Sequence, residues 1–132
     1  MESMVSKSSE NINAAKLLIS NNMYSASVHC AYYSSFQYTK YILSEYVGIN
    51  YQQQQNVCRD KDSHKVIYGM MCDKLIDDIV ASNIYQGHYK NLKRLRIKAD
   101  YGTYAINKEE AKQSLRKAEA LNQLLHNKYE HK

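Results

Sequence analysis

The stretch from residue 23 to residue 48 reads MYSASVHCAYYSSFQYTKYILSEYVG and decides the fold class. Apolar and small side chains recur at helical spacing along two stripes, one through Val28 and one through Leu43. Only Lys40 and Glu45 bring charge into it. A helix that is apolar or small on two faces is packed by neighbours on both sides. The stretch therefore predicts a central helix over about residues 23–47, ended by Gly48, which tolerates a left-handed conformation.

Four further helices are predicted around this one. The segment INYQQQQNVCRDK, residues 49–61, is polar and is expected to form a loop. The predicted helices cover about residues 8–20, 63–81, 84–100 and 108–127. Ser8 or Ser9 is the predicted N-cap of the first, and Ile79 is predicted to lie in the core on the second. Asn107 and Glu110 are predicted to form a capping box at the start of the last. Short connections favour antiparallel neighbours. We expect one domain over residues 1–132, an all-α, antiparallel up-and-down bundle of about five helices.

Composition excludes several other classes of protein. The chain has no proline and only 4 glycines among 132 residues, too few turn residues for a β-sandwich or barrel. No stretch approaches the length of uncharged apolar residues that a transmembrane helix needs, and the polar start, residues 1–4, is unlike a secretory signal. The three cysteines, Cys30, Cys58 and Cys72, lack the spacing of zinc ligands. We expect a cytoplasmic protein with no membrane, metal or cofactor requirement.

The positive charge is concentrated in the last third of the chain. Residues 1–83 carry 7 basic and 8 acidic side chains, whereas residues 84–132 carry 11 basic and 5 acidic ones. This asymmetry fits a phosphate-bearing partner or an acidic protein partner, and charge alone does not choose between them.

The densest group of basic residues is KNLKRLRIKADY, residues 90–101. On a helix, Lys93, Arg96 and Asp100 share one face, and a neighbouring face carries Lys90, Arg94 and Lys98. One interpretation is a solvated helix surface with an Arg96–Asp100 ion pair. The other is a patch that faces phosphate or nucleic acid.

Tyrosine is the unusual feature of the composition, with 13 tyrosines against one phenylalanine and no tryptophan. Six of them, Tyr33 included, lie on the predicted central helix. Rings on such a helix fit a packed core, whose buried hydroxyl groups need partners. Exposed rings beside Arg and Lys instead fit stacking against bases.

Two motifs, taken together, resemble the HEPN domain family. The first is AKLL at residues 15–18, followed by YSA at 24–26, AYYSSF at 31–36 and Lys40. The second is RIKADY at residues 96–101, followed by EEA at 109–111 and AE at 118–119. Asp62-Ser63-His64-Lys65 is similar to the start of the family's middle helix. The resemblance covers roughly residues 10–125.

The resemblance implies a small helical bundle, usually a symmetric homodimer. Many members are toxins or defence RNases that act without metal through an Arg-x(4–6)-His motif, in which His moves protons and Arg binds the scissile phosphate. Many small members are paired with a minimal nucleotidyltransferase as a toxin–antitoxin system.

This sequence departs from the family's catalytic motif. Tyr101 stands where an RNase would have His, with Asp100 before it. Arg59 and His64 match Arg-x4-His literally, but they precede the third predicted helix, where the family's motif does not lie.

Three hypotheses follow. The first is one component of a two-component system that binds a nucleotidyltransferase partner, nucleotide or RNA. The second is an RNase in which Arg96, Asp100 and Tyr101 are catalytic. The third is a dimeric scaffold without catalysis. In the first two, the ligand-binding residues are expected to be Lys90, Lys93, Arg94, Lys98 and Tyr33.

Overall fold

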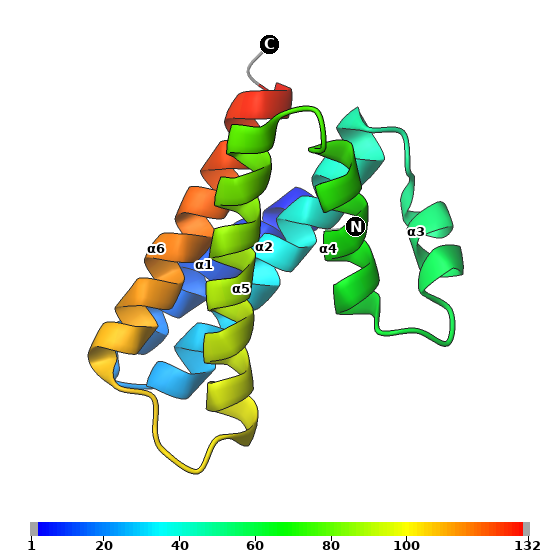
Figure 1. Ribbon diagram of the computed structural model, residues 1–132. Helices are drawn as coiled ribbons and strands as arrows, with labels where there is room; N and C mark the ends of the chain where they lie inside the picture. Colours follow the sequence, from blue (N-terminus) through cyan, green and yellow to red (C-terminus); the bar gives the residue numbers. More distant parts are fainter. Residues whose placement is uncertain (1–2, 131–132) are drawn as a thin grey trace.

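The computed structural model describes residues 3–130, and within this range the regular structure is entirely helical (Figure 1). The predicted all-α bundle is confirmed, with six α-helices in place of about five. They are α1 (Met4–Ser20), α2 (Tyr24–Tyr46), α3 (Tyr51–Cys58), α4 (Ser63–Lys74), α5 (Ile79–Tyr101) and α6 (Lys108–Leu125), followed by a π-helical turn at His126–Glu130.

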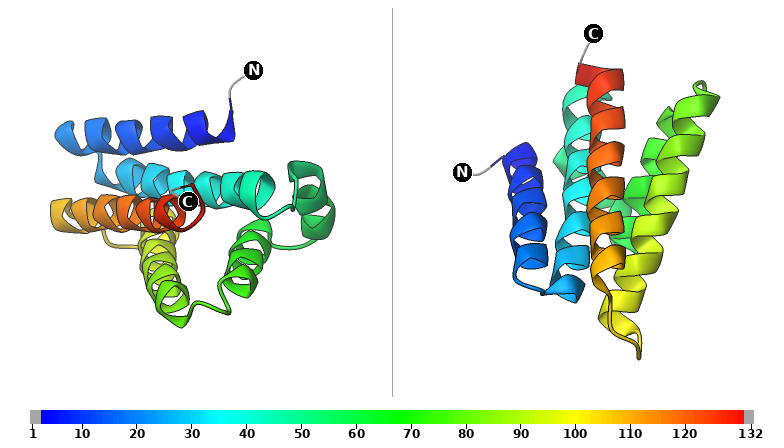
Figure 2. Two further views of the ribbon diagram at one scale, coloured as in Figure 1. Left: turned by 90° about the horizontal axis from the view of Figure 1, so that it is seen from above. Right: turned by 90° about the vertical axis from the view of Figure 1, so that its left-hand side faces the viewer.

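The centre of the bundle is α2, as its apolar stripes predict. It packs against α1 on one side and against α6, α5 and α4 on the other (Figure 2). Consecutive helices α1 and α2 run antiparallel, and so do α5 and α6 (Figure 2). Val28, Ala31, Ile42 and Leu43 are fully buried, and Gly48 ends the segment at a φ of +84°. The core therefore surrounds α2 along most of its length.

The first helix begins earlier than predicted. It starts at Met4, where the Ser3 hydroxyl accepts a hydrogen bond from the backbone N–H of Ser6. Ser8, a predicted N-cap, is instead buried in the second turn, and its hydroxyl donates to the carbonyl oxygen of Ser34 on α2 at 2.8 Å. The serine that resembled a capping residue is thus a contact between two helices.

The segment predicted as a loop, residues 49–61, contains the short helix α3. Asn50 and Gln53 form a reciprocal capping box at its start. The buried side chain of Gln54 then joins α3 to the end of α2, because its amide donates to the carbonyl oxygens of Lys40 and Ile49 at 3.0 and 2.8 Å. Capping and this tertiary tether outweigh the low apolar content of the segment.

The long third helix predicted over residues 63–81 is two helices. α4 ends at Lys74, and α5 begins at Ile79, where the Asp78 carboxylate caps the backbone N–H of Ala81. The break changes the helical phase, so Ile79, predicted in the core, is 72% exposed. The Asn107–Glu110 capping box at the start of α6 forms as predicted.

Leu121 on α6 offers a test of this core. It is fully buried, whereas Leu17 on α1 is 64% exposed. Leu121→Ala removes buried apolar surface and leaves a cavity, so we expect it to lower the free energy of unfolding by about 2–5 kcal/mol. Leu17→Ala, measured by the same urea denaturation, is expected to change it by no more than about 0.5 kcal/mol. Equal losses in the two variants would contradict this packing.

Candidate functional site

The basic stretch of α5 divides into residues that point toward α2 and residues that remain in solvent. Arg96 points inward, and only 19% of its side chain is exposed. Lys90 and Arg94 are exposed. Lys93 lies over the ring of Tyr89, with its Nζ 5.9 Å from the ring centroid. The predicted ligand-binding lysines and arginines therefore do not share one surface.

Arg96 packs its guanidinium against two tyrosines of α2. Its Cζ lies 5.0 Å from the ring centroid of Tyr32 and 5.9 Å from that of Tyr33. Its Nε is 3.4 Å from Oδ2 of Asp100, one turn further along α5. The ring faces and the carboxylate hold the guanidinium in a fixed orientation, since both attract a cation.

Asp100 also contacts a histidine that sequence analysis did not select. Nδ1 of His29, on α2, lies 3.4 Å from Oδ1 of Asp100. The His29 ring also packs on that of Tyr33, with 4.6 Å between centroids. Asp100 thus lies between an imidazole and the guanidinium of Arg96, and it orients both.

A second histidine reaches the same place from α4. Nε2 of His64 lies 3.4 Å from the hydroxyl oxygen of Tyr33, and its ring centroid is 4.4 Å from that of Phe36. Burial and, secondarily, the positive charge of Arg96 lower the pKa of His64 from its ordinary value. His64 is therefore favoured in its neutral form, which can accept a proton.

These five residues, His29, Tyr33, His64, Arg96 and Asp100, form what we call the imidazole–guanidinium cluster. They come from α2, α4 and α5, which the fold brings together. Nδ1 of His64 is buried and has no hydrogen-bond partner within residues 3–130, and the buried Nε of Arg96 has its ion pair with Asp100 but no hydrogen bond in the same range. Unsatisfied buried polar atoms are costly and concentrate at functional sites, so the cluster is the candidate site.

An aromatic wall closes the inner side of the cluster. Tyr68 of α4 and Tyr89 of α5 are stacked at 3.8 Å between centroids, and the Tyr68 ring also neighbours that of Tyr32 at 6.0 Å. The Tyr68 hydroxyl is buried and, among the described residues, also lacks a partner. Tyr32 and Tyr33, in front of this wall, leave only 19% of the Arg96 side chain exposed, and low exposure strengthens the guanidinium's interactions with an anion.

The structure joins only some of the predicted site residues. Arg96, Asp100 and Tyr33 belong to the cluster. Tyr101 does not belong to the cluster, because it lies at the end of α5 with 76% of its surface exposed. Lys98 pairs with Glu110 of α6, with 2.7 Å between Nζ and Oε2.

The two histidines were missed because they lie far from Arg96 in the chain. His29 could have been found from its position one turn before Tyr33 on α2, a spacing that places both on one face. His64 was noted within Arg-x4-His, yet Arg59 of that motif is exposed at the end of α3. The literal motif therefore does not form a site, although its histidine belongs to one.

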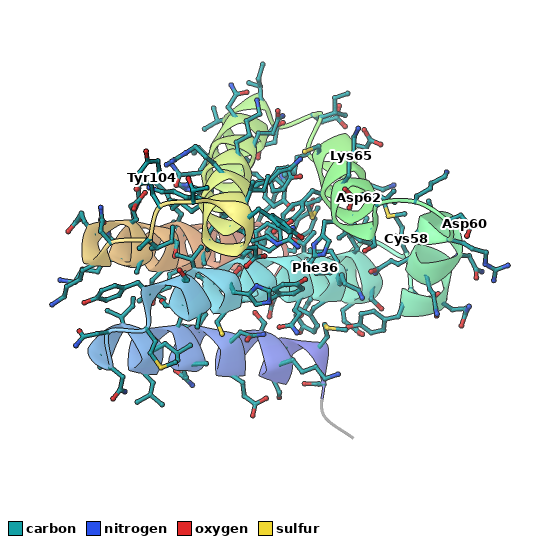
Figure 3. All side chains as sticks on the ribbon, turned by 90° about the horizontal axis from the view of Figure 1, so that it is seen from below. Phe36, Cys58, Asp60, Asp62, Lys65 and Tyr104 are labelled. Atoms are coloured by element: carbon teal, nitrogen blue, oxygen red, sulfur yellow. The ribbon has the colours of Figure 1, made fainter. Side chains whose placement is uncertain are left out.

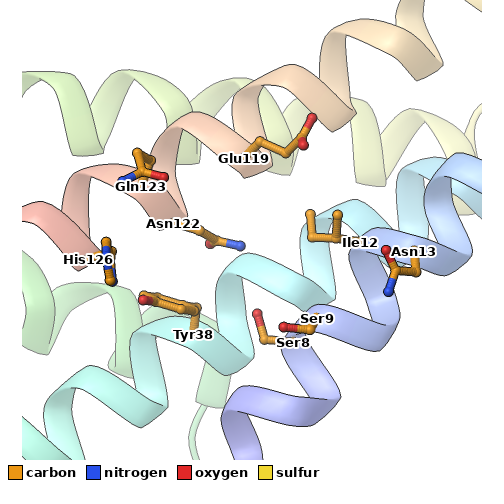
Figure 4. Close-up of a pocket in the computed structure, with 9 residues that line it drawn as sticks. All are labelled: Ser8, Ser9, Ile12, Asn13, Tyr38, Glu119, Asn122, Gln123 and His126. Carbon is orange, nitrogen blue, oxygen red and sulfur yellow. The ribbon is translucent and has the colours of Figure 1, made fainter. Parts of the chain in front are cut away.

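Two hollows in the surface differ in their relation to the cluster. A hollow of about 490 Å³ between α1, α2 and α6 has a polar lining that includes Asn13, Glu119 and Gln123 and contains no member of the cluster (Figure 4). A hollow of about 310 Å³ lies beside Phe36, the ring that packs against His64. Only the second adjoins the cluster.

The molecule is thus an all-α bundle in which imidazole and guanidinium groups meet at the junction of three helices. The model of the HEPN domain family matches residues 1–128, and the chain belongs to this family. Neither a curated protein nor a solved structure gave a match. Among the helices of residues 3–130, none has the length and apolar character that a bilayer crossing requires.

The lowered pKa of His64 predicts a pH dependence of stability. The unfolded chain takes up a proton as pH falls through about 6.5, whereas folded His64 resists it, so stability falls with pH and the loss is complete below the folded pKa. His64→Gln removes this contribution. Between about pH 7.5 and pH 5.5, urea denaturation should therefore show a smaller loss of stability for the variant than for the native chain. An unchanged loss would contradict the burial of a neutral His64.

Proposed function

We propose that the imidazole–guanidinium cluster binds the phosphate of a nucleotide or of an RNA strand. The observation that carries the proposal is the convergence of Arg96, His29 and His64 on Tyr33, with the buried Nδ1 of His64 left without a hydrogen-bond partner among the described residues. A planar guanidinium matches phosphate oxygens with paired hydrogen bonds, and imidazoles add further donors when protonated.

The surroundings of the cluster favour an anion over a cation. Lys40 lies over the Phe36 ring, its Nζ 5.5 Å from the centroid, and both Lys40 and Arg96 lower the pKa of His64 by their positive charge. Asp100 is the one carboxylate in the cluster, and it is engaged by His29 and Arg96. The exposed Lys90 and Arg94 on α5 add a positive field that attracts a phosphate-bearing ligand.

Metal-independent RNA cleavage is a second candidate, favoured by the two different histidine environments. His64, with its lowered pKa, would accept the proton of a ribose 2′-hydroxyl as that oxygen attacks the phosphorus. His29, held by Asp100, would donate a proton to the departing 5′ oxygen. Arg96 would stabilise the negative charge that develops on the phosphoryl oxygens. This assignment gives the proton transfers to histidines rather than to Asp100 or Tyr101.

A two-component role remains part of the proposal. The chain would act in the cytoplasm as a homodimer paired with a minimal nucleotidyltransferase, in a toxin–antitoxin or defence system. The family membership supports this pairing. A nucleotidyltransferase gene beside this one, and a product that co-purifies with this chain, are the expected findings. The competing outcome is a dimeric scaffold without ligand or catalysis. It would be favoured if the native chain bound no nucleotide and if the Arg96→Ala variant still bound the partner.

Binding is tested by calorimetry with AMP and by fluorescence anisotropy with a labelled single-stranded RNA. Arg96→Ala is expected to weaken binding about ten- to a hundredfold, because it removes charge-assisted hydrogen bonds to phosphate. Arg96→Lys keeps the charge without the planar fork and should give an intermediate loss. Arg116→Ala, which removes an exposed arginine of α6, is the matched control and should bind normally.

A comparison of how much binding each substitution costs decides whether the ligand binds at the cluster or over a diffuse basic surface. Arg94→Ala removes a predicted ligand-binding residue that is exposed on the same helix. A loss for Arg94→Ala as large as that for Arg96→Ala, in proteins with native circular dichroism, would contradict the cluster. Failure of the native chain to bind either ligand would contradict the proposed function itself.

Cleavage is tested with the same RNA in the presence of a chelator. We expect His64→Ala and His29→Ala each to lower the rate by about a hundredfold or more, as loss of a general base or acid does. Equal rates in the native and variant proteins would rule out the second candidate and leave binding unaffected.

A further inference from the structure

The hollow beside Phe36 is a built pocket at the junction of four helices. It measures about 310 Å³, at the small end of the range of ligand sites, and is lined from α1, α2, α3 and α4. Figure 3 shows Phe36 on α2 on the same side of the molecule as Cys58 and Asp62, which flank the connection from α3 to α4, while Tyr104 lies at the other side. Phe36 and Tyr51 give the lining two aromatic rings, and Lys40 gives it a cation.

Gln54 supplies an unused hydrogen-bond acceptor in this lining. Its side chain is only 1% exposed, and both hydrogens of its Nε2 are committed to the carbonyl oxygens of Lys40 and Ile49. Its Oε1 has no hydrogen-bond partner in the described part of the chain. Because the amide cannot turn without losing two hydrogen bonds, Gln54 acts at this place as an acceptor and not as a donor. A ligand that brings an N–H donor would satisfy it.

The lining groups match a flat, aromatic, nitrogen-rich ligand. The Tyr51 ring, which is 36% exposed, offers a stacking surface, and the buried Phe36 ring gives an apolar wall. Gln54 offers an acceptor, and Lys40 offers a donor for a ring nitrogen or carbonyl oxygen. Among the residues that line the pocket there is no carboxylate, so an electron-rich ring meets no repulsion. An amino-bearing nucleobase combines a donor and an acceptor along one edge, and its ring stacks.

The pocket and the imidazole–guanidinium cluster share a wall. The Phe36 ring lines the pocket and packs 4.4 Å from the His64 ring, centroid to centroid. Ser63, which also lines the pocket, precedes His64 in the chain. A base in the pocket therefore lies beside the place where the cluster would hold phosphate of the same strand.

We propose that the pocket formed by Phe36, Lys40, Tyr51 and Gln54 is a base-binding subsite for a nucleobase with an exocyclic amino group, adenine being the probe. The choice of a nucleotide over other aromatic ligands rests on the proposed phosphate-binding function. The inference goes beyond that function because it assigns α3, which contributes nothing to the cluster, a role in recognition.

The test uses nucleosides, which carry no phosphate and so do not depend on Arg96. Adenosine titrated into the ¹⁵N-labelled full chain is expected to shift the amide signals of residues 51–58. Purine riboside, which lacks only the amino group, should bind about tenfold more weakly because Gln54 is then left unpaired. Equal binding of the two nucleosides, or shifts confined to other helices, would overturn the assignment.

Protein variants provide the second arm of the test. Gln54 ties α3 to α2, so its replacement risks unfolding the segment, and Tyr51 is varied instead. Tyr51→Ala removes a partly exposed ring of the pocket and should weaken adenosine binding about tenfold. Tyr46→Ala removes a ring of similar exposure that does not line the pocket, and it should bind adenosine normally. Equal effects of the two substitutions would overturn the proposal.

The Arg96→Ala variant separates this inference from the proposed function. One outcome would support the pocket and refute the cluster. In it, the Arg96→Ala variant still binds adenosine, and the native chain binds AMP no more tightly than adenosine. Phosphate-dependent binding that is lost in Arg96→Ala, with no preference for adenosine over purine riboside, would support the cluster and refute the pocket.

Discussion

The enclosure of α2 is the constraint on which the rest of the structure depends. A helix packed on nearly every side needs small residues where its neighbours approach, and each buried hydroxyl then needs a partner. The hydroxyl groups of α2 find these partners on three other helices and so fix how those helices sit along it. The contacts join Ser27 to the carbonyl oxygen of Ala15, Ser34 to that of Ser8, Ser35 to that of Ala118, and Thr39 to the hydroxyl of Tyr85.

The same enclosure explains why the candidate site lies at the edge of the core. The small residues of α2 face α1 and α6, and its larger rings, Tyr32 and Phe36, face α4 and α5. Arg96 covers Tyr32 from α5, and His64 covers Phe36 from α4. Large aromatic faces at the border of a packed core attract cationic and imidazole groups. The polar cluster is thus built on the aromatic side of the central helix.

Local pattern predicted the bundle well, because periodicity and capping are properties of neighbouring residues. The central helix and the Asn107–Glu110 box needed no tertiary information. The helix α3 has a local signal in its Asn50–Gln53 capping box, but it also depends on a tether from Gln54 to α2, which no local pattern contains. Of the five residues in the cluster, the sequence predicted only Arg96, Asp100 and Tyr33 as site residues. Its histidines come from other helices, and whether they meet Arg96 depends on helix packing and on a helix boundary that the continuous apolar pattern concealed.

That boundary, the four residues 75–78 between α4 and α5, has a further consequence. At 1.5 Å per residue, one uninterrupted helix would carry His64 and Arg96 about 48 Å apart along a single rod. The bend folds the rod back on itself, and the two side chains then meet across Tyr33. Their distance thus depends on the length of the bend, and also on its fully buried Leu75 and on Asp78, which caps α5. A one-residue insertion there would rotate one histidine away from its arginine, although every residue of both helices remained unchanged.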